Sequence, residues 1–334
     1  MLGRLARELP RGEYLYEPKW DGFRALAFRD GEEVELQSRH GNPLARYFPE
    51  LVAALRGLPI ERLVLDGEIV PLHSDFPALM ARLHPAASRV ERLARETPSG
   101  FVAFDLLAVA DESLLERAFG KRRRGLEDAL RGAPTPLHVT PATRDPAEAE
   151  RWLDRFEGVV AKPLAAPYQP GKRALLKVKR ERTADCVVAG FRWRADRPLP
   201  SSLLLGLYDG GGELQHVGVA SGLSVRQAET LLEELRPLVV DLAGHSWERG
   251  FLVGGGSLGR LRGAAGRWTP GMTMDWTPVA PVRVAEVAYN QLDENRFRHP
   301  ARFRRWRDDR EPRSCTFEQL DAAPALRLDA LVAS

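Results

Sequence analysis

The sequence predicts an α+β protein of two domains, in which a mixed domain of strands and helices precedes a small β-barrel. The 334 residues give room for roughly two domains of about 150 residues each. Short strands alternate with helical segments over residues 1–182. Residues 183–321 are rich in short strands and contain one predicted helix, which favours a barrel over a sandwich. Residues 322–334 are expected to form a C-terminal tail.

The elements of the first domain follow from local patterns. Asp30-Gly31 separates two strand-like runs at 24–29 and 34–38, which predicts a hairpin with a tight turn. Helical spacing extends over 76–96 with a break near Pro85. Asp145-Pro146 starts another helix, because Asp caps helix N-termini and Pro suits the first helical position. Further strands are expected at 14–18, 63–70, 101–107, 157–162 and 174–179.

The second domain reads as strands separated by glycine-rich turns. Ser224 begins a helix, and Gln227 completes a capping box with it. Residues 254–266 form a glycine-rich loop that is no phosphate-binding loop, since the chain has no GxxxxGK[ST] sequence. The strands are expected at 187–191, 203–208, 214–220 and 282–289.

Lysine is scarce in this chain. Of 49 basic residues only six are lysines, and such an excess of arginine is typical of a GC-rich genome. The net charge of +3 permits a polyanionic partner without requiring one. Arginine can replace lysine as a surface charge, but its guanidinium stays protonated and cannot serve as an amine nucleophile. Each remaining lysine is therefore a candidate for chemistry: Lys19, Lys121, Lys162, Lys172, Lys177 and Lys179.

Several classes of protein are excluded. Cys186 and Cys315 are the two cysteines, which rules out a disulfide scaffold and a four-cysteine zinc site. No run of about 18 apolar residues exists, so no membrane-spanning helix is expected. The N-terminus becomes charged too early for a signal peptide. A cytoplasmic location without a membrane partner is expected.

Clusters of charged residues mark the candidate site. Lys19 follows a predicted strand and could attack an electrophile if burial and nearby cations lower its pKa. By itself the segment 19–24 is also compatible with an exposed hairpin stem that carries a Lys-Asp pair, although the nucleophile interpretation is favoured, and Phe104 by itself is typical of a core residue. Taken together, the carboxylates could bind divalent cations and the lysines could neutralise a triphosphate. The other charged pairs are Asp66 with Glu68, Glu157 with Lys162, and Lys177 with Lys179.

In their order along the chain, these segments resemble the motifs of covalent nucleotidyltransferases, and most nearly the small two-domain bacterial ATP-dependent DNA ligases. Residues 298–310 resemble the C-terminal motif of the same family, and the resemblance extends over residues 14–320. It implies a nucleotidyltransferase domain of antiparallel sheets with flanking helices, followed by an OB-fold β-barrel. The earlier motifs are Lys19-x-Asp21-Gly22-x-Arg24, Asp66-Gly67-Glu68, Phe101 to Asp105, Glu157 to Lys162 and Leu176-Lys177-Val178-Lys179.

The resemblance also implies a role for each motif residue. Lys19 would attack the α-phosphate of ATP and form a lysyl-AMP adduct, with Mg²⁺ or Mn²⁺ as the metal. Glu17 would meet the adenine, and Phe104 would stack on it. The remaining expected contacts are Arg24, Arg39 and Glu68 with ribose or the nick phosphate, Lys162, Lys177 and Lys179 with phosphates, Arg307 and Arg310 with the pyrophosphate, and Glu157 and Glu68 with the metal.

The implied activity is the sealing of nicks in duplex DNA. A 3′-hydroxyl would displace AMP from an adenylated 5′-phosphate, in a DNA repair role. Nicked duplex DNA and other repair proteins are the expected partners of a monomeric, nucleoid-associated enzyme. Two positions depart from the family pattern: Leu175 and Leu176 stand where tryptophan is frequent, and Arg310 stands where lysine is common.

Four alternatives stay open. An RNA ligase or an RNA-capping guanylyltransferase shares the Lys-x-Asp-Gly motif, and the latter would use GTP. The long second domain and its Arg307-x-Asp309-Arg310 ending favour a DNA ligase over an RNA ligase. An NAD-dependent ligase would need a cysteine zinc site that is absent. A non-catalytic OB-fold protein that binds nucleic acid is the alternative from another class.

Overall fold

The structure, a computed structural model, describes residues 1–74, 76–248, 252–253, 257–258, 276–293 and 295–320. The chain divides into two compact units, Met1–Arg180 and a second unit that begins at Glu181. The expected loop at 254–266, apart from residues 257–258, and the expected tail at 322–334 lie outside the described residues.

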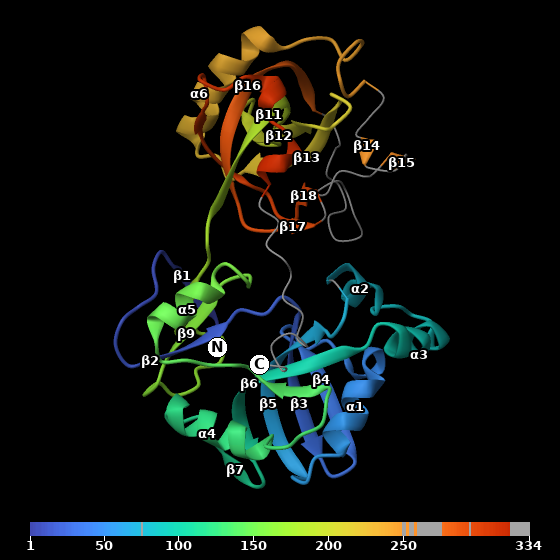
Figure 1. Cartoon of the computed structure of the whole chain (residues 1–334), viewed down its shortest axis with the longest axis vertical. Helices are drawn as coiled ribbons and strands as arrows, with labels where there is room; N and C mark the ends of the chain where they lie inside the picture. Colours follow the sequence, from blue (N-terminus) through green and yellow to red (C-terminus); the bar gives the residue numbers. More distant parts are fainter. Residues whose placement is uncertain (75, 249–251, 254–256, 259–275, 294, 321–334) are drawn as a thin grey trace. The chain divides into compact units, whose positions relative to one another are not determined.

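The first unit contains two sheets (Figure 1). Its strands are β1 (Gly3–Ala6), β2 (Tyr14–Pro18), β3 (Phe23–Asp30), β4 (Glu33–Ser38), β5 (Arg62–Pro71), β6 (Ser99–Val109), β7 (Glu112–Ser113), β8 (Leu137–Val139), β9 (Val159–Pro163) and β10 (Leu175–Val178). One sheet has the order β1-β10-β9-β2, and the other has the order β4-β3-β5-β6-β7 with β8 paired to β6. The strands pair antiparallel except for β1 with β10 and β6 with β8.

Helices pack on these sheets. They are α1 (Pro49–Arg56), α2 (Phe76–Ala81), α3 (Ala87–Glu96), α4 (Phe119–Ala129) and α5 (Pro146–Trp152), with a 3₁₀ turn at Ala45–Tyr47. The predicted break near Pro85 is confirmed, because α2 and α3 lie on either side of it. The predicted cap is also confirmed, since the Asp145 side chain accepts from the Ala147 amide. No helix predicted from the sequence corresponds to α1 or α4.

The core of the larger sheet follows from its residue pattern. On β3, Ala25 and Ala27 are fully buried, as expected where alternate side chains face a core. On α1, Leu51 and Leu55 are also fully buried, because residues four apart share one face of a helix. These faces meet in one apolar cluster between sheet and helix. The opposite face of the sheet carries polar side chains, Arg24 and Asp66 among them.

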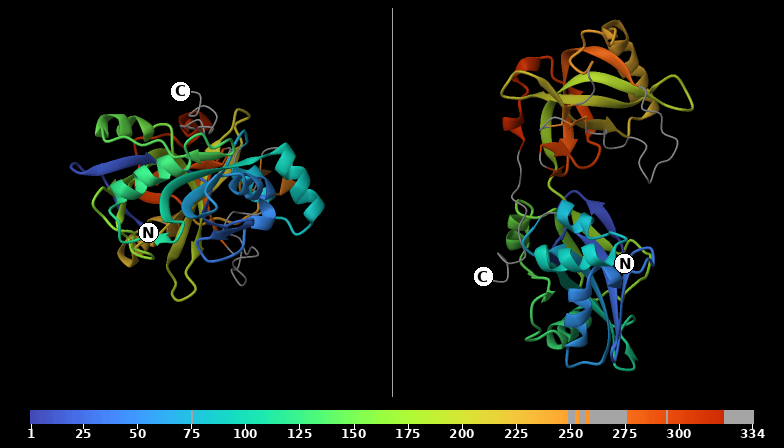
Figure 2. Two further views of the ribbon diagram at one scale, coloured as in Figure 1. Left: turned by 90° about the horizontal axis from the view of Figure 1, so that it is seen from below. Right: turned by 90° about the vertical axis from the view of Figure 1, so that its right-hand side faces the viewer.

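The second unit is built on a curved antiparallel sheet with the order β13-β12-β11-β16-β19. The Ala301 amide donates to Val219 and the Ser221 amide donates to Ala301, so the segment before β19 closes against β13. Figure 2 shows α6 on the outside of these strands. The elements are β11 (Arg182–Trp193), β12 (Pro200–Tyr208), β13 (Leu214–Ser221), α6 (Val225–Leu235), β14 (Leu252–Val253), β15 (Ser257–Leu258), β16 (Thr277–Tyr289), β17 (Leu292–Asp293), β18 (Arg296–Phe297) and β19 (Arg302–Trp306), with 3₁₀ turns at Arg236–Leu238, Pro312–Ser314 and Phe317–Gln319.

Sequence and structure agree on the class of fold. The predicted α+β class, with antiparallel sheets, flanking helices and a strand-rich second part, is confirmed. The capping box of Ser224 and Gln227 at the start of α6 is present. Within the part of the chain that the structure describes, no helix is long and apolar enough to cross a membrane.

Candidate active site

A cavity of about 560 Å³ lies between the two sheets of the first unit. Both sheets contribute to its walls, with β2, β9 and β10 on one side and β5 and β6 on the other. It brings together eight of the twelve predicted site residues. They are Glu17, Lys19, Arg24, Arg39, Glu68, Phe104, Lys162 and Lys177.

The main chain fixes the position of Lys19. This residue directly follows β2, and its amide donates to the Gly158 carbonyl at 2.8 Å. Glycine is required at two positions near Lys19, because at each of them another strand's backbone approaches too closely for a side chain. A Cβ at Gly22 would lie 2.0 Å from the Ile69 carbonyl oxygen, and one at Gly158 would lie 2.3 Å from the Val178 oxygen. Gly22 thus allows the segment after Lys19 to pack against β5, and Gly158 allows the segment before β9 to pack against β10.

The Lys19 amine contacts Glu157. The Glu157 carboxylate accepts from Lys19 through one oxygen and from Lys179 through the other. The Glu157 side chain is 7% exposed and that of Lys19 is 27% exposed. Glu157 precedes β9, which resolves the odd spacing between Glu157 and Lys162. The amine thus keeps access to the cavity while an acceptor for its proton lies beside it.

Burial changes the ionisation of two groups in the cavity. Desolvation lowers the pKa of the Lys19 amine to about 8, while the Glu68 charge opposes this shift and the Lys179 charge adds to it. Desolvation also raises the pKa of Glu68 to about 7, against the attraction of Lys19 and Arg24. A fraction of the Lys19 amine is therefore neutral near neutral pH, as nucleophilic attack requires.

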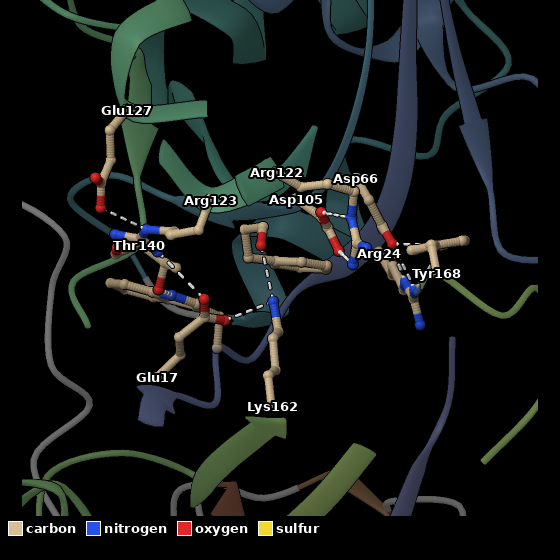
Figure 3. Close-up of polar contacts among 12 residues, drawn as sticks. Glu17, Arg24, Asp66, Asp105, Arg122, Arg123, Glu127, Thr140, Lys162 and Tyr168 are labelled. Carbon is tan, nitrogen blue, oxygen red and sulfur yellow. Dashed lines mark hydrogen bonds and ion pairs between the residues drawn. The ribbon is translucent and has the colours of Figure 1, made fainter. Parts of the chain in front are cut away.

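A second carboxylate, Glu17, is buried between two cations (Figure 3). Lys162 Nζ lies 2.7 Å from Glu17 Oε2, and Arg123 Nη1 donates to Glu17 Oε1 at 3.2 Å. Arg123 is itself held by the Thr140 carbonyl at 2.8 Å and by Glu127 at 2.7 Å. Burial raises the pKa of Glu17, and the charges of Lys162 and Arg123 oppose that rise.

Phe104 lies between the cations of the cavity. Lys162 Nζ is 4.5 Å from the centre of its ring, and the Arg24 guanidinium carbon is 5.6 Å from it. Lys162 also donates to the Phe104 carbonyl at 2.8 Å. The ring lines the cavity wall beside Glu17 and is half-buried. The ring is thus near two cations, which are attracted to the electron-rich face of an aromatic ring.

Arg24 is held by a network that starts at Asp66. The fully buried Asp66 carboxylate accepts from Arg24 Nε at 3.0 Å and from Arg24 Nη2 at 2.6 Å. The Tyr168 hydroxyl donates to the same carboxylate at 2.8 Å, and Arg24 also donates to the Met1 carbonyl. Such a bidentate pair fixes the plane of the guanidinium as well as its position (Figure 3).

Three predicted residues line the cavity, and their side chains form no ion pair or hydrogen bond within the described part of the chain: Arg39, Glu68 and Lys177. Desolvation and the neighbouring charges of Lys179, Arg173 and Arg39 lower the pKa of Lys177. Cations that repel one another in this way are suited to bind a polyanion. These residues therefore differ from Glu17 and Lys162, whose charges are paired.

The remaining two predicted residues belong to the second unit. Arg307 donates to both oxygens of Asp185 at 3.0 and 3.1 Å and to Asp309 at 2.9 Å. Arg310 Nε lies 3.8 Å from the same Asp185 carboxylate. Hydrogen bonding to Asp309 raises the pKa of Arg307, so its charge is permanent. The predicted pyrophosphate contact of both arginines stays a prediction.

The donor set suits a magnesium-like ion only in part. Within the described chain, no group of three or more His, Cys, Asp or Glu side chains is arranged to hold a metal. Glu68 and Glu157 are two carboxylates near Lys19, and Mg²⁺ commonly takes one or two carboxylates together with waters and substrate phosphates. The residues present therefore fit a metal that arrives with a polyphosphate.

Sequence reasoning missed several residues of this site. Arg123 belongs to a basic run, 121–124, which is typical of a solvated helix face, yet Arg122 and Arg123 are buried. Arg122 pairs with Asp105 at 2.8 and 3.0 Å. Tyr168 lies in the loop between β9 and β10, where no local pattern marks it. Paired carboxylates on adjacent strands, Asp66 and Asp105, were the available signal that buried arginines would be needed.

A different protein-family model matches each of the two units. Residues 3–179 match the family model of the ATP dependent DNA ligase domain. Residues 196–310 match the ATP dependent DNA ligase C terminal region. Together these matches cover most of both compact units.

Similar proteins are found along nearly the whole chain. DNA ligase C2 of Mycolicibacterium smegmatis is 50% identical over 335 aligned residues, which cover 97% of this chain and 94% of that protein. DNA ligase C of Mycobacterium tuberculosis is 47% identical over 95% of this chain and 92% of its own length. A solved structure of the Lig E DNA ligases aligns with a TM-score of 0.56 at 18% identity, covering 92% of this chain and 99% of that one, which supports the fold alone.

Proposed function

The chain belongs to the ATP-dependent DNA ligases, and we propose that Lys19 is the nucleophile that takes AMP from ATP. The lone pair of its neutral amine attacks the α-phosphorus and forms a P–N bond, while the bond to the β-phosphate oxygen breaks and pyrophosphate leaves. The contact with Glu157 supports this role, because a carboxylate is in place for the proton that the amine must lose. The lowered pKa of Lys19 supports it further.

We assign the part of the cavity that is lined by Glu17 and Phe104 to the base of ATP. Glu17 is an acceptor on the wall, and the Phe104 ring beside it offers a flat apolar surface for stacking. Lys162, predicted to contact phosphate, donates to Glu17 and to the Phe104 carbonyl. Its phosphate contact stays a prediction.

We assign another part of the cavity to phosphates. Arg39 and Lys177 line it as cations without ion pairs to described residues, and Lys179 lies beside Glu157. Arg24, held by Asp66, is proposed to contact ribose or the 5′-phosphate of a nick, together with Glu68. In such displacements positioning and charge neutralisation supply most of the catalysis, which suits a wall of fixed cations.

A divalent metal, Mg²⁺ or Mn²⁺, completes this proposal. Glu157 and Glu68 would hold it, and when bound it would neutralise charge on the phosphate oxygens. Arg307 and Arg310 would orient the pyrophosphate. Their shared partner Asp185 supports a joint role, because it holds both guanidinium groups at one place on the second unit.

The substrate proposed for the later steps is nicked duplex DNA. Transfer of AMP to the 5′-phosphate frees Lys19, and the 3′-hydroxyl then attacks the adenylated phosphate and releases AMP. A relative at 34% identity over 91% of this chain is named a multifunctional non-homologous end joining DNA repair protein, which supports a repair role. We further propose a monomer in the cytoplasm, associated with the nucleoid and with other repair proteins.

The observation that carries this proposal is the Lys19 amine, partly exposed in the cavity and paired with Glu157. Incubation with α-labelled ATP and a divalent metal, followed by denaturing electrophoresis, tests it. The unaltered protein should retain label and Lys19→Ala should not. Lys121→Ala is the matched control, since it removes an exposed lysine outside the cavity. Label that survives in Lys19→Ala would overturn the assignment.

The nucleic acid is tested separately. A nicked duplex with DNA on both sides of the nick should be sealed faster than the same nick with an RNA strand. Sealing of the RNA nick at an equal or higher rate would favour the RNA ligase alternative. Label from GTP in place of ATP would favour a capping activity.

A further inference from the structure

The buried charge network behind Glu17 extends beyond the residues that face the cavity. Figure 3 shows Arg123 between Glu127 and Glu17, with Lys162 on the other side of Glu17. Arg123 is 8% exposed and Glu17 is 2% exposed. Arg123 does not line the cavity, so it acts on a bound nucleotide indirectly, and Glu17 is the cavity residue to which it donates a hydrogen bond.

Arg123 is anchored from three directions. Its Nη2 donates to the Thr140 carbonyl, its Nε donates to Glu127, and its Nη1 donates to Glu17 Oε1. Thr140 is held in turn, because Trp20 Nε1 donates to its hydroxyl at 2.8 Å. The guanidinium therefore has little freedom, and the Glu17 oxygen that it binds is fixed with it.

We propose that Arg123 is a positioning residue that sets nucleotide choice by holding Glu17 as an acceptor-only carboxylate toward the base. This inference rests on the proposed function, in which Glu17 faces the purine. An ionised carboxylate accepts hydrogen bonds and cannot donate. It therefore favours a purine with an amino group at C6 and disfavours one with a carbonyl there, as in guanine.

Loss of Arg123 would change the chemistry of that contact. Burial raises the pKa of Glu17, and the facing charges are Lys162 on β9, Arg123 on α4 and Asp105 on β6. Without Arg123 one of two compensating cations is gone, so more Glu17 is protonated as pH falls. A protonated carboxyl can donate to the C6 carbonyl of guanine, which weakens the discrimination.

The test is the ratio of initial labelling rates with α-labelled ATP and α-labelled GTP. We expect Arg123→Met to lower the ATP-to-GTP ratio by about tenfold or more, because hydrogen-bonding sites discriminate strongly. The decrease should grow as pH falls from about 8 to about 6. Arg123→Lys restores the charge without the fork of donors and should give an intermediate ratio.

Arg124→Met is the matched control. It removes one arginine from the same helix at an exposed position, and its ratio should stay that of the unaltered protein. Because the readout is a ratio within one protein, loss of folded material cancels. If Arg123→Met yields no folded protein, Glu127→Gln loosens the same guanidinium and should lower the ratio to a smaller extent.

An unchanged ratio in Arg123→Met and Arg123→Lys, with both rates lowered equally, would overturn the inference and leave Arg123 a structural residue. An unchanged ratio in Glu127→Gln would do the same if it were the variant available. Failure of the unaltered protein to label with ATP would instead contradict the proposed function. The two failures are therefore distinguishable.

Discussion

Glu17 lines the cavity and Glu157 lies beside it, and these two glutamates have similar surroundings that differ in one respect. Glu157 lies between Lys19 and Lys179, and Glu17 lies between Lys162 and Arg123. Both carboxylates are nearly buried, with side chains 7% and 3% exposed. The amines differ, because the Lys19 side chain is 27% exposed and that of Lys162 is 4% exposed.

This difference separates a reactive pair from a rigid one. Lys162 is enclosed by Glu17, by the Phe104 carbonyl, and by the rings of Phe104 and Phe119. Lys19 has one strong partner and an open side toward the cavity. A salt bridge therefore indicates neither reactivity nor rigidity by itself. The access of its amine to solvent and substrate decides which role it can take.

The largest effect is expected from Lys19→Arg. The substitution keeps a cation beside Glu157 but removes an amine that can lose its proton. Labelling by ATP should fall to background, while thermal unfolding stays near that of the unaltered protein. Denaturing electrophoresis and calorimetry measure the two. Substantial remaining label would show that charge alone suffices at this position.

Removal of the two carboxylates should affect stability unequally. Glu17→Ala leaves Lys162 and Arg123 buried without their carboxylate, which costs about 3–5 kcal/mol in such sites. Glu157→Ala should cost less, about 1 kcal/mol, since Lys19 can regain solvent. Denaturant titration measures both free energies of unfolding. Equal losses would mean that the two pairs are equally buried in solution.

The rate of lysyl-AMP formation should depend on pH through Lys19. With a pKa of about 8 the amine is mostly protonated below that pH, so the rate should rise about tenfold per pH unit and level off above it. Lys179→Met removes a charge that lowers this pKa, so the midpoint should move to higher pH. Glu68→Gln removes a charge that raises it, so the midpoint should move to lower pH.

Single-turnover labelling between about pH 6 and pH 10 measures these midpoints. Arg7→Met serves as the control, because Arg7 is exposed and outside the cavity. Shifts of the same sign in Lys179→Met and Glu68→Gln would contradict the electrostatic origin of the lowered pKa.

The smallest effect is expected from Tyr168→Phe. It removes one hydrogen bond to the buried Asp66, which still accepts two from Arg24. The free energy of unfolding should fall by about 1 kcal/mol, as measured by denaturant titration. A loss above about 3 kcal/mol would show that Tyr168 is essential to the network rather than an addition to it.

The site residues that lie in short motifs could be predicted from the sequence, whereas Arg123 and Tyr168 could not. Lys19, Glu157 and Lys177 lie in short motifs that local spacing makes visible. Arg123 and Tyr168 act on residues 106 and 102 positions away. Such pairings depend on how the sheets and α4 pack, and no local pattern encodes them.

The elements of the fold likewise differ in how well the sequence predicted them. Strands with alternating or apolar runs, such as Tyr14–Pro18, were predicted at their observed limits. Helix α4 was not predicted, because Gly120 and Gly125 interrupt its sequence and its basic run is typical of a solvent-exposed surface. Tertiary contacts with β6 and the buried acids stabilise it instead.

The backbone hydrogen bond from Lys19 to Gly158 has a consequence for engineering. This bond holds the main chain of Lys19, and Glu157 contacts its amine, so neither contact involves Glu17 or Phe104, the residues assigned to the base. The residues assigned to the base could then be changed for a different nucleotide while these contacts of Lys19 are kept. Gly158 is the position that such a design must leave untouched, since any side chain there would push β9 and β10 apart.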